Sequence, residues 1–136
     1  MFNPPINLKF KKRHKFNLNV IDYRVNCLKF GQFGLRALES GYLSVNQIEA
    51  TRKAIIKQIK KVGKLHIRIF PDLGITTKPA EVRMGKGKGA VSYWAAPIRV
   101  GRILFEVSGI PLDKAKEVLT FGAAKLPVKT RFICKY

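Results

Sequence analysis

Lysine and arginine are the residues through which this 136-residue chain could do chemistry, because they far outnumber its acids. The sequence holds 27 Lys and Arg against 8 Asp and Glu, which gives a formal net charge of +19. Charge of one sign repels itself and costs stability unless a polyanion neutralises it. The balance therefore favours a nucleic acid or an anionic membrane surface as the partner.

The cationic side chains fall into four stretches that contain no acidic residue: 9–15, 52–68, 83–89 and 125–135. A single stretch is compatible with a solvated face, but four in one small domain indicate contacts with phosphates. Outside the third stretch, the candidate phosphate-binding residues are Lys9, Lys11, Lys12, Arg13, His14, Lys15, Arg52, Lys53, Lys57, Lys60, Lys64, Lys129 and Arg131.

The third stretch, Arg83-Met84-Gly85-Lys86-Gly87-Lys88-Gly89, alternates glycine with lysine. It is not a P-loop, because no Ser or Thr follows a Gly-Lys pair at the required spacing. It fits the dinucleotide fingerprint only loosely, with no strand expected before it and no helix after it. Since glycine lets a backbone approach closely, we expect a mobile cationic finger that enters a narrow, phosphate-lined space. An exposed loop without a partner is the alternative interpretation.

Groups suited to catalysis or metal binding are sparse. His14, His66, Cys27 and Cys134 stand at spacings unlike a zinc site, and no nucleophile beside a base stands out. We therefore predict no enzyme activity, no metal, no cofactor and no small-molecule substrate. The cysteines are expected to be free, buried thiols of a reducing compartment.

Membrane and targeting signals are also weak. No apolar run approaches the ~18 residues that a membrane span requires, so we predict no membrane partner. The first 16 residues lack the apolar core of a secretory signal, and Pro4-Pro5 does not suit an amphipathic transit peptide. They are interpreted as part of the working protein.

A helix predicted from Ser44 to Gly63 is the clearest element that positions the cations. Ser44 and Gln47 form a capping-box pattern, and Gly63 supplies the stop. At about 100° per residue, an apolar stripe and a cationic stripe lie on opposite faces. The apolar stripe is Ile48, Ile55, Ile59 and Val62, and the cationic stripe is Lys53, Lys57, Lys60 and Lys64.

Alternation and turn residues predict the other elements. Strands are expected over 65–70, 93–100 and 103–107, with a turn at Gly101. Pro97 places its strand at an edge or a bulge, and Pro111 opens a second helix in its first turn. The segment 128–135 alternates as a strand with one mostly basic face.

The predicted fold class is α+β, with a mainly antiparallel sheet covered by two helices. Residues 1–27 are expected to form a basic, extended N-terminal segment, and residues 28–136 a single domain.

Seven short motifs carry a family resemblance: 47–50 (Gln-Ile-Glu-Ala), 64–72 (Lys-Leu-His-Ile-Arg-Ile-Phe-Pro-Asp), 77–79 (Thr-Lys-Pro), 83–89, 93–94 (Tyr-Trp), 104–106 (Leu-Phe-Glu) and 123–127 (Ala-Ala-Lys-Leu-Pro). In this order they resemble the bacterial-type family of large-subunit ribosomal protein sixteen. The resemblance covers residues 28–134 and the cluster at 9–15. It departs from the family at residues 17–27, which are apolar where the family is rich in Gly and Arg. His66 and Gly74 replace the usual Trp and Pro.

The resemblance implies a structural constituent of the large ribosomal subunit that supports translation and subunit assembly. It implies that residues 9–15 thread into large-subunit rRNA, and that Arg83–Gly89 faces tRNA near the A site and the peptidyl-transferase centre. We assign the other phosphate-binding candidates to rRNA. The implied partners are rRNA, tRNA and neighbouring large-subunit proteins. A free RNA-binding regulator or a membrane-surface protein is the rival interpretation.

The composition leans on Ile, Phe, Lys and Asn, which AT-rich codons favour. With the missing transit pattern, this suggests an organelle-encoded protein. We expect a mitochondrial ribosome in the matrix, with a plastid or a bacterial cytoplasm as alternatives.

Overall fold

The structure is a computed structural model that describes residues 5, 7–60 and 62–135. In chain order its elements are β1 (Phe33–Ala37), β2 (Gly41–Ser44), α1 (Val45–Ile59), β3 (Lys64–Ile67), β4 (Leu73–Thr77), β5 (Ala90–Ile98), β6 (Ile103–Ser108), α2 (Leu112–Ala123) and β7 (Thr130–Cys134). Among the described residues before Phe33, none forms a helix or a strand. We call residues 7–27 the N-terminal arm.

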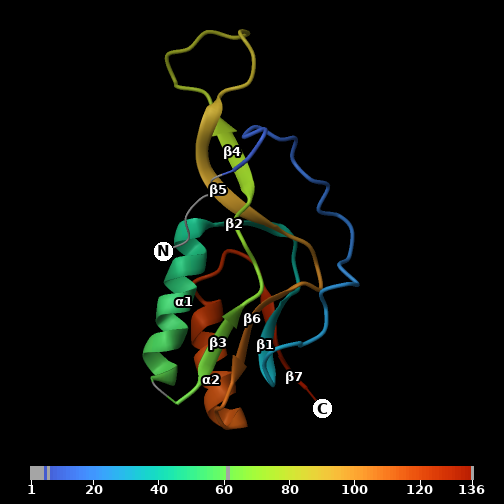
Figure 1. Cartoon of the computed structure of the whole chain (residues 1–136), viewed down its shortest axis with the longest axis vertical. Coiled ribbons are helices and arrows are strands. Elements are labelled where there is room, and N and C mark those ends of the chain that lie inside the picture. Colours follow the sequence, from blue (N-terminus) through green and yellow to red (C-terminus); the bar gives the residue numbers. More distant parts are fainter. Residues whose placement is uncertain (1–4, 6, 61, 136) are drawn as a thin grey trace.

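The strands form two sheets, and every strand pair is antiparallel. A four-stranded sheet has the order β3-β6-β1-β7, and a three-stranded sheet has the order β2-β5-β4. The two helices lie side by side against the four-stranded sheet (Figure 1). The α+β prediction is confirmed, but one sheet becomes two because the chain changes sheets at the tight turn around Gly101, which joins β5 to β6.

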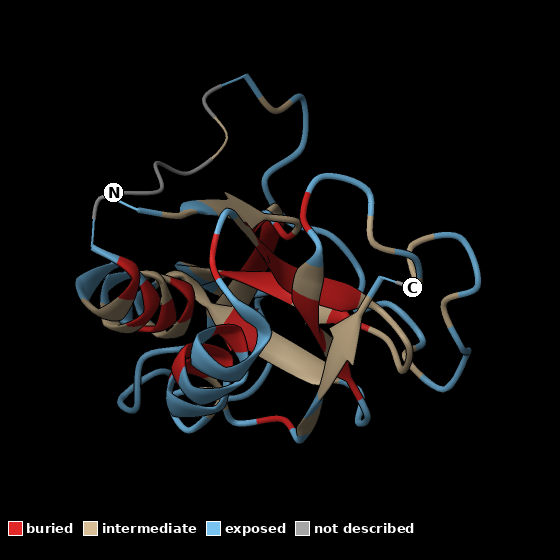
Figure 2. Cartoon of the chain, turned by 90° about the horizontal axis from the view of Figure 1, so that it is seen from below, coloured by how far each residue is buried: buried red, intermediate tan, exposed pale blue. Residues whose placement is uncertain are grey.

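The hydrophobic core lies between the helices and the strands, where the buried residues face one another (Figure 2). Leu35 and Phe105 from the sheet and Ile55 and Leu119 from the helices are almost completely buried. Each such side chain stabilises the fold by about 1.5–3 kcal/mol through removal of apolar surface from water. The β4–β5 hairpin extends beyond this core at the far end of the molecule (Figure 1).

Helix α1 begins as predicted and ends earlier than predicted. The Ser44 hydroxyl accepts the Gln47 N–H, and the Gln47 side chain accepts the Ser44 N–H, so the capping box is confirmed. The helix ends at Ile59, because Lys60 turns to a φ of 57°. Val62 is therefore 72 % exposed instead of buried. Gly63 does not stop the helix; a Cβ there would lie 2.7 Å from the Ile59 side chain and 3.0 Å from the Ser108 carbonyl, so it permits close packing.

The other predicted boundaries shift by a few residues. The strand expected over 93–100 is β5 (Ala90–Ile98), which starts earlier because it pairs with β4 as far as Thr77. At Pro97, β5 pairs with β2 alone, so it is locally an edge as expected. Pro111 is the N-cap of α2 instead of its first-turn residue. Both cysteines are free, but Cys27 is exposed and Cys134 is only partly buried, which corrects the expectation of buried thiols.

Candidate nucleic-acid interface

The loop that joins β4 to β5 carries the glycine–lysine repeat at the tip of the hairpin (Figure 1). Gly85, Lys86 and Gly87 have φ values of 91°, 57° and 82°, in the left-handed region that favours glycine. A Cβ on either of these two glycines would meet no atom within 4 Å, so glycine is needed there for backbone conformation. Met84 at the tip is 98 % exposed. The backbone thus holds the tip open to solvent.

Gly89 serves a different purpose at the neck of the same loop. A Cβ there would lie 2.4 Å from the Thr77 carbonyl oxygen. Only glycine therefore lets the ends of β4 and β5 approach this closely. Across the loop, the Lys78 Nζ donates to the Gly85 carbonyl at 2.6 Å. The prediction that no strand precedes the repeat is wrong, since β4 leads into it and β5 follows.

The N-terminal arm lies beside this loop, although the two are far apart in the sequence. Lys12 Nζ donates to the Lys88 carbonyl at 2.9 Å, and Lys88 Nζ donates to the Arg13 carbonyl at 2.6 Å. Lower on the hairpin, a Cβ on Gly74 would stand 3.0 Å from the Lys11 carbonyl oxygen. The glycine that replaces the usual proline thus permits close contact with the arm.

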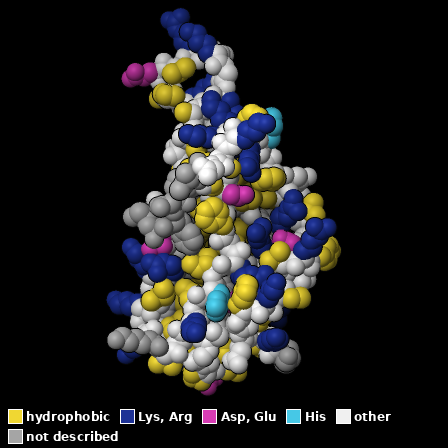
Figure 3. All heavy atoms as spheres, in the orientation of Figure 1, with side chains coloured by type: hydrophobic (Ala, Val, Ile, Leu, Met, Phe, Trp, Pro, Cys, Tyr) yellow, Lys and Arg dark blue, Asp and Glu magenta, His cyan; other side chains and the backbone are white. Residues whose placement is uncertain are grey.

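These contacts bring together two candidate sites that the sequence places separately. We call residues 9–15 and 83–89 together the tip surface. Lysine and arginine side chains gather at its upper end and along the adjoining edge (Figure 3). Within the described residues, the side chains of Arg83 and Lys86 make no hydrogen bond or ion pair. Their charges are therefore available to an outside anion.

The cations of α1 lie on the other side of the molecule from the arm (Figure 1). Lys53, Lys57 and Lys60 are exposed. Arg52 is held by Glu49 at 2.7 and 2.9 Å, and this hydrogen-bonded pair lowers the pKa of Glu49 and raises the pKa of Arg52. Lys60 is the C-cap of α1 and Lys64 begins β3, so only Lys53 and Lys57 of the predicted cationic row lie on the helix. Arg52 is therefore partly neutralised within the chain.

The cations of β7 lie at the edge of the four-stranded sheet. Lys129 and Arg131 are both exposed, as the alternating pattern predicts. Lys129 pairs with Glu39 at 3.0 Å, and hydrogen bonds from Lys129 lower the pKa of Glu39. Lys129 directly precedes β7, whereas Arg131 lies within the strand and makes no ion pair in the described chain.

A buried carboxylate that the sequence analysis did not single out fixes the base of the arm. Glu106 in β6 is fully buried and accepts the N–H groups of Lys29, Phe30 and Gly31 at 3.1, 2.6 and 2.7 Å. It also accepts the guanidinium of Arg68, which is thereby removed from the cationic face. Burial raises the pKa of Glu106, but the hydrogen bonds from Gly31, Arg68, Phe30 and Lys29 outweigh it and the pKa is lowered. Glu106 is the one charged residue of β6, and this is the sequence signal that could have identified it.

The remaining candidates for chemistry are dispersed. His14 lies in the arm, whereas His66 in β3 stacks on Phe30 with ring centroids 5.6 Å apart. Across the residues that can be described, no three His, Cys, Asp or Glu side chains come together as a metal site would require. None of the helices in that part of the chain is long and apolar enough to cross a membrane.

Taken together, the fold and the surface define a small, strongly basic α+β protein whose exposed cations include those of the arm, the hairpin tip and α1. A sequence model of the family described as ribosomal protein L16p/L10e matches residues 5–133. The chain therefore belongs to this family of structural ribosomal proteins, which are not enzymes.

Individual relatives agree with the family match. The chain is 51 % identical over 129 residues to the large ribosomal subunit protein uL16 of Azorhizobium caulinodans, covering 95 % of this chain and 94 % of that protein. It is 52 % identical to the protein of the same name from Bartonella henselae, with the same coverage. The uL16 protein of Gluconacetobacter diazotrophicus is 49 % identical over 131 residues, which cover 96 % of this chain and 95 % of that protein.

Proposed function

We propose that this chain binds large-subunit rRNA and helps to position tRNA near the A site and the peptidyl-transferase centre. The convergence of the arm and the hairpin loop carries this proposal, because it concentrates cations at one end of the molecule. In this role Arg83–Gly89 faces tRNA, and residues 9–15 contact rRNA beside it. The exposed cations of α1, β3 and β7 add rRNA contacts on the body, while neighbouring ribosomal proteins complete the particle.

The proposed rRNA contacts predict a steep dependence of affinity on salt. If about 8 phosphates are neutralised, the logarithm of the association constant falls with the logarithm of the salt concentration at a slope of about −6 to −7. A filter-binding titration of the full chain with large-subunit rRNA measures this slope. A flat dependence would exclude phosphate contacts as the source of affinity.

The proposed tRNA role is tested by changing only cations whose side chains make no hydrogen bond or ion pair with the described residues. Arg83→Ala combined with Lys86→Ala leaves the Lys12–Lys88 and Lys88–Arg13 contacts in place. We expect the altered chain to enter large subunits normally and the subunits to bind A-site tRNA at least about tenfold more weakly, since the loss of even one charge-assisted contact costs about 1.5–3 kcal/mol. Lys114→Ala with Lys116→Ala on α2 removes the same charge as a control. Failure of assembly by the tip variant alone would make the loop an rRNA anchor instead.

The proposed location is the mitochondrial ribosome, with a plastid or a bacterial cytoplasm as alternatives. The codon-biased composition supports an organelle, and the three relatives above are bacterial. Sedimentation of lysed, purified mitochondria in high salt tests it directly. Co-migration of the chain with the mitochondrial large subunit is the expected result.

A further inference from the structure

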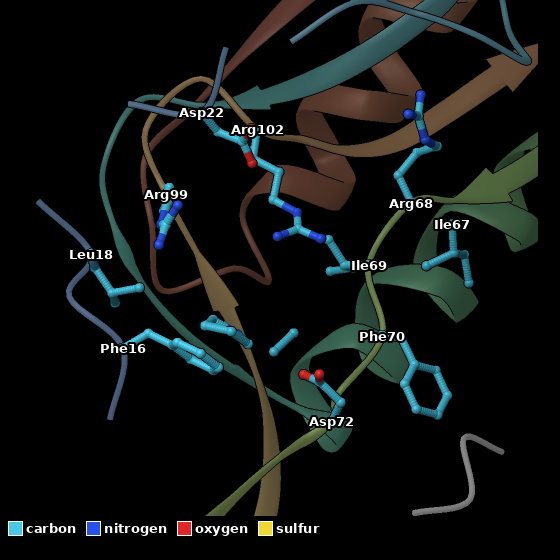
Figure 4. A pocket seen from close by; sticks show the side chains of 12 residues that line it. Phe16, Leu18, Asp22, Ile67, Arg68, Ile69, Phe70, Asp72, Arg99 and Arg102 are labelled. Carbon is cyan, nitrogen blue, oxygen red and sulfur yellow. The ribbon is translucent and has the colours of Figure 1, made fainter. Parts of the chain in front are cut away.

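A hollow of about 570 Å³ lies between the N-terminal arm and the body, beginning at Phe16, where the arm leaves the tip surface. Its walls come from three separate segments: Phe16 and Leu18 of the arm, the stretch between β3 and β4 that ends at Asp72, and the β5–β6 turn with Arg99 and Arg102 (Figure 4). Its size falls in the range of about 300–1,000 Å³ that is usual for small-ligand sites.

Arg102 is the arginine that lies most centrally in the hollow, and the chain leaves its side chain short of acceptors. Its Nε is buried and has no hydrogen-bond partner among the described residues. Its guanidinium points into the middle of the hollow, whereas Arg68 points away toward its partner Glu106 (Figure 4). An unsatisfied buried donor is costly, and native proteins almost always supply it with an acceptor. Arg99, on the same turn, likewise makes no ion pair within the described chain. The two arginines therefore provide donors for an anion.

Two carboxylates also line the hollow, and they limit which chemical groups a bound anion can carry. Asp22 is engaged, because its Oδ1 accepts the N–H groups of Arg24 and Val25 at 3.2 and 3.3 Å. The carboxylate of Asp72 makes no hydrogen bond or ion pair with the described residues, and it points into the hollow (Figure 4). A free carboxylate repels a simple anion but accepts hydrogen bonds from amino groups. The ligand should therefore carry both a negative group and a hydrogen-bond donor.

Phe16 adds a third property to the hollow. Phe16 is 42 % exposed and forms part of the wall contributed by the arm. An exposed aromatic ring beside cationic groups is the usual platform on which an unpaired base stacks. A nucleotide combines the flat ring, the phosphate and, in three of the four RNA bases, an exocyclic amino group.

We propose that this hollow binds one unpaired RNA nucleotide that carries an exocyclic amino group. Arg99 and Arg102 hold its phosphate, and Phe16 stacks on its base. Asp72 accepts a hydrogen bond from the amino group. The inference rests on the proposed function and deepens it, because it gives rRNA a specific contact on the body in addition to the diffuse cationic surfaces.

The test compares hexacytidylate with hexauridylate, which have equal charge. Cytosine carries an amino group that can donate a hydrogen bond to Asp72, and uracil has a carbonyl oxygen at the same position. Fluorescence anisotropy of the labelled hexanucleotides is measured with the full chain at constant salt. We expect about fivefold tighter binding of hexacytidylate, as one good base contact implies. Asp72→Asn should remove this preference, since the amide also offers a donor to the uracil carbonyl. Equal binding of the two hexanucleotides by the unaltered chain would overturn the proposal.

Variants separate the hollow from general charge attraction. Arg99→Gln with Arg102→Gln should weaken hexacytidylate binding about tenfold, whereas Lys114→Gln with Lys116→Gln, which removes the same charge, should change it less than twofold. Equal losses would overturn the proposal. Phe16→Leu keeps an apolar wall on the arm and should weaken hexacytidylate binding about fivefold. If the arginine variant does not fold, the Phe16 variant decides the test, and unchanged binding by it would overturn the proposal.

Two further measurements distinguish the possible reasons for a negative result. Displacement of hexacytidylate by polyglutamate at equal charge would make the hollow a groove for an acidic peptide and overturn the RNA assignment. Retention of full rRNA affinity and salt dependence, with no effect of any hollow variant on hexacytidylate, would reject the hollow alone. Loss of rRNA binding by the unaltered chain would reject the proposed function itself.

Discussion

The helix-covered body and the β4–β5 hairpin tip are stabilised by different kinds of interaction. In the body, apolar side chains such as Leu35, Phe105 and Leu119 are removed from water almost completely. At the tip, every residue from Thr77 to Lys88 is exposed. The tip is held by backbone conformation and by lysine-to-carbonyl hydrogen bonds to the arm and across the loop.

This difference separates stability from binding. Burial and a satisfied carboxylate fix the body, so its residues should affect the free energy of unfolding. The cations at the tip bury little surface and repel one another, so their charge is stabilised chiefly by an outside polyanion. Substitutions in the two regions should therefore change different measured quantities.

Removal of the Glu106 carboxylate should give the largest effect on stability. Glu106→Ala leaves the Arg68 guanidinium and three backbone N–H groups without their acceptor. Loss of one partner of a buried ion pair costs about 3–5 kcal/mol. Urea unfolding followed by circular dichroism measures the change, with Glu117→Ala on the exposed face of α2 as a control. A loss below about 1 kcal/mol would show that the carboxylate does not fix the base of the arm.

The same residue predicts the acid sensitivity of the fold. The folded pKa of Glu106 is lowered below its ordinary value of 4.5, so its stabilising effect is complete above that pH and is lost as the pH falls through the folded pKa. The free energy of unfolding should therefore decline from about pH 4.5 downward. Glu106→Gln should flatten this decline, and an unchanged pH profile in the variant would assign it to other carboxylates.

Two glycines of the hairpin loop should differ in their effect, although they lie four residues apart. Gly89→Ala forces a Cβ to 2.4 Å from the Thr77 carbonyl, so the strands must separate at the neck, at a cost of about 1–3 kcal/mol. Gly85→Ala meets no atom and costs about 1–2 kcal/mol, through its φ of 91° alone. Thermal unfolding of both variants measures the difference. Equal effects would mean that one cause, backbone conformation, governs both positions.

Local signals in the sequence predicted the parts of the fold that depend on neighbouring residues. The capping box predicted the start of α1, and Pro111 predicted the start of α2 to within one residue. Strand β1 was missed because its pattern is interrupted by Gly34, where a Cβ would lie 2.9 Å from the Phe105 carbonyl. Its place in the sheet depends on β6 and β7, far along the chain.

For the candidate interface too, the sequence predicted what depends on residue types and missed what depends on contacts between distant residues. The cationic stretches and the glycine repeat are visible as residue types, and the structure shows most of these side chains exposed. The pair of Glu49 with Arg52 follows from their i,i+3 spacing on the predicted helix, but the pair of Glu106 with Arg68, 38 positions apart, has no local signal. The convergence of the arm with the loop depends on contacts between residues about 75 positions apart, which no local pattern encodes.

The smallest effect on stability should come from the contact between the arm and the loop. Lys12→Gln replaces the ammonium group that donates to the Lys88 carbonyl at 2.9 Å with a shorter, neutral amide, which weakens this exposed hydrogen bond. Surface changes of this kind alter the free energy of unfolding by about 0.5 kcal/mol or less. The local order should change more: heteronuclear ¹⁵N nuclear Overhauser effects should fall at residues 11–15 and 86–88 together. Lys15→Gln, whose side chain makes no hydrogen bond within the described residues, should leave them unchanged. A fall confined to the arm would show that the loop holds its conformation without it, and that the tip surface consists of two independent parts.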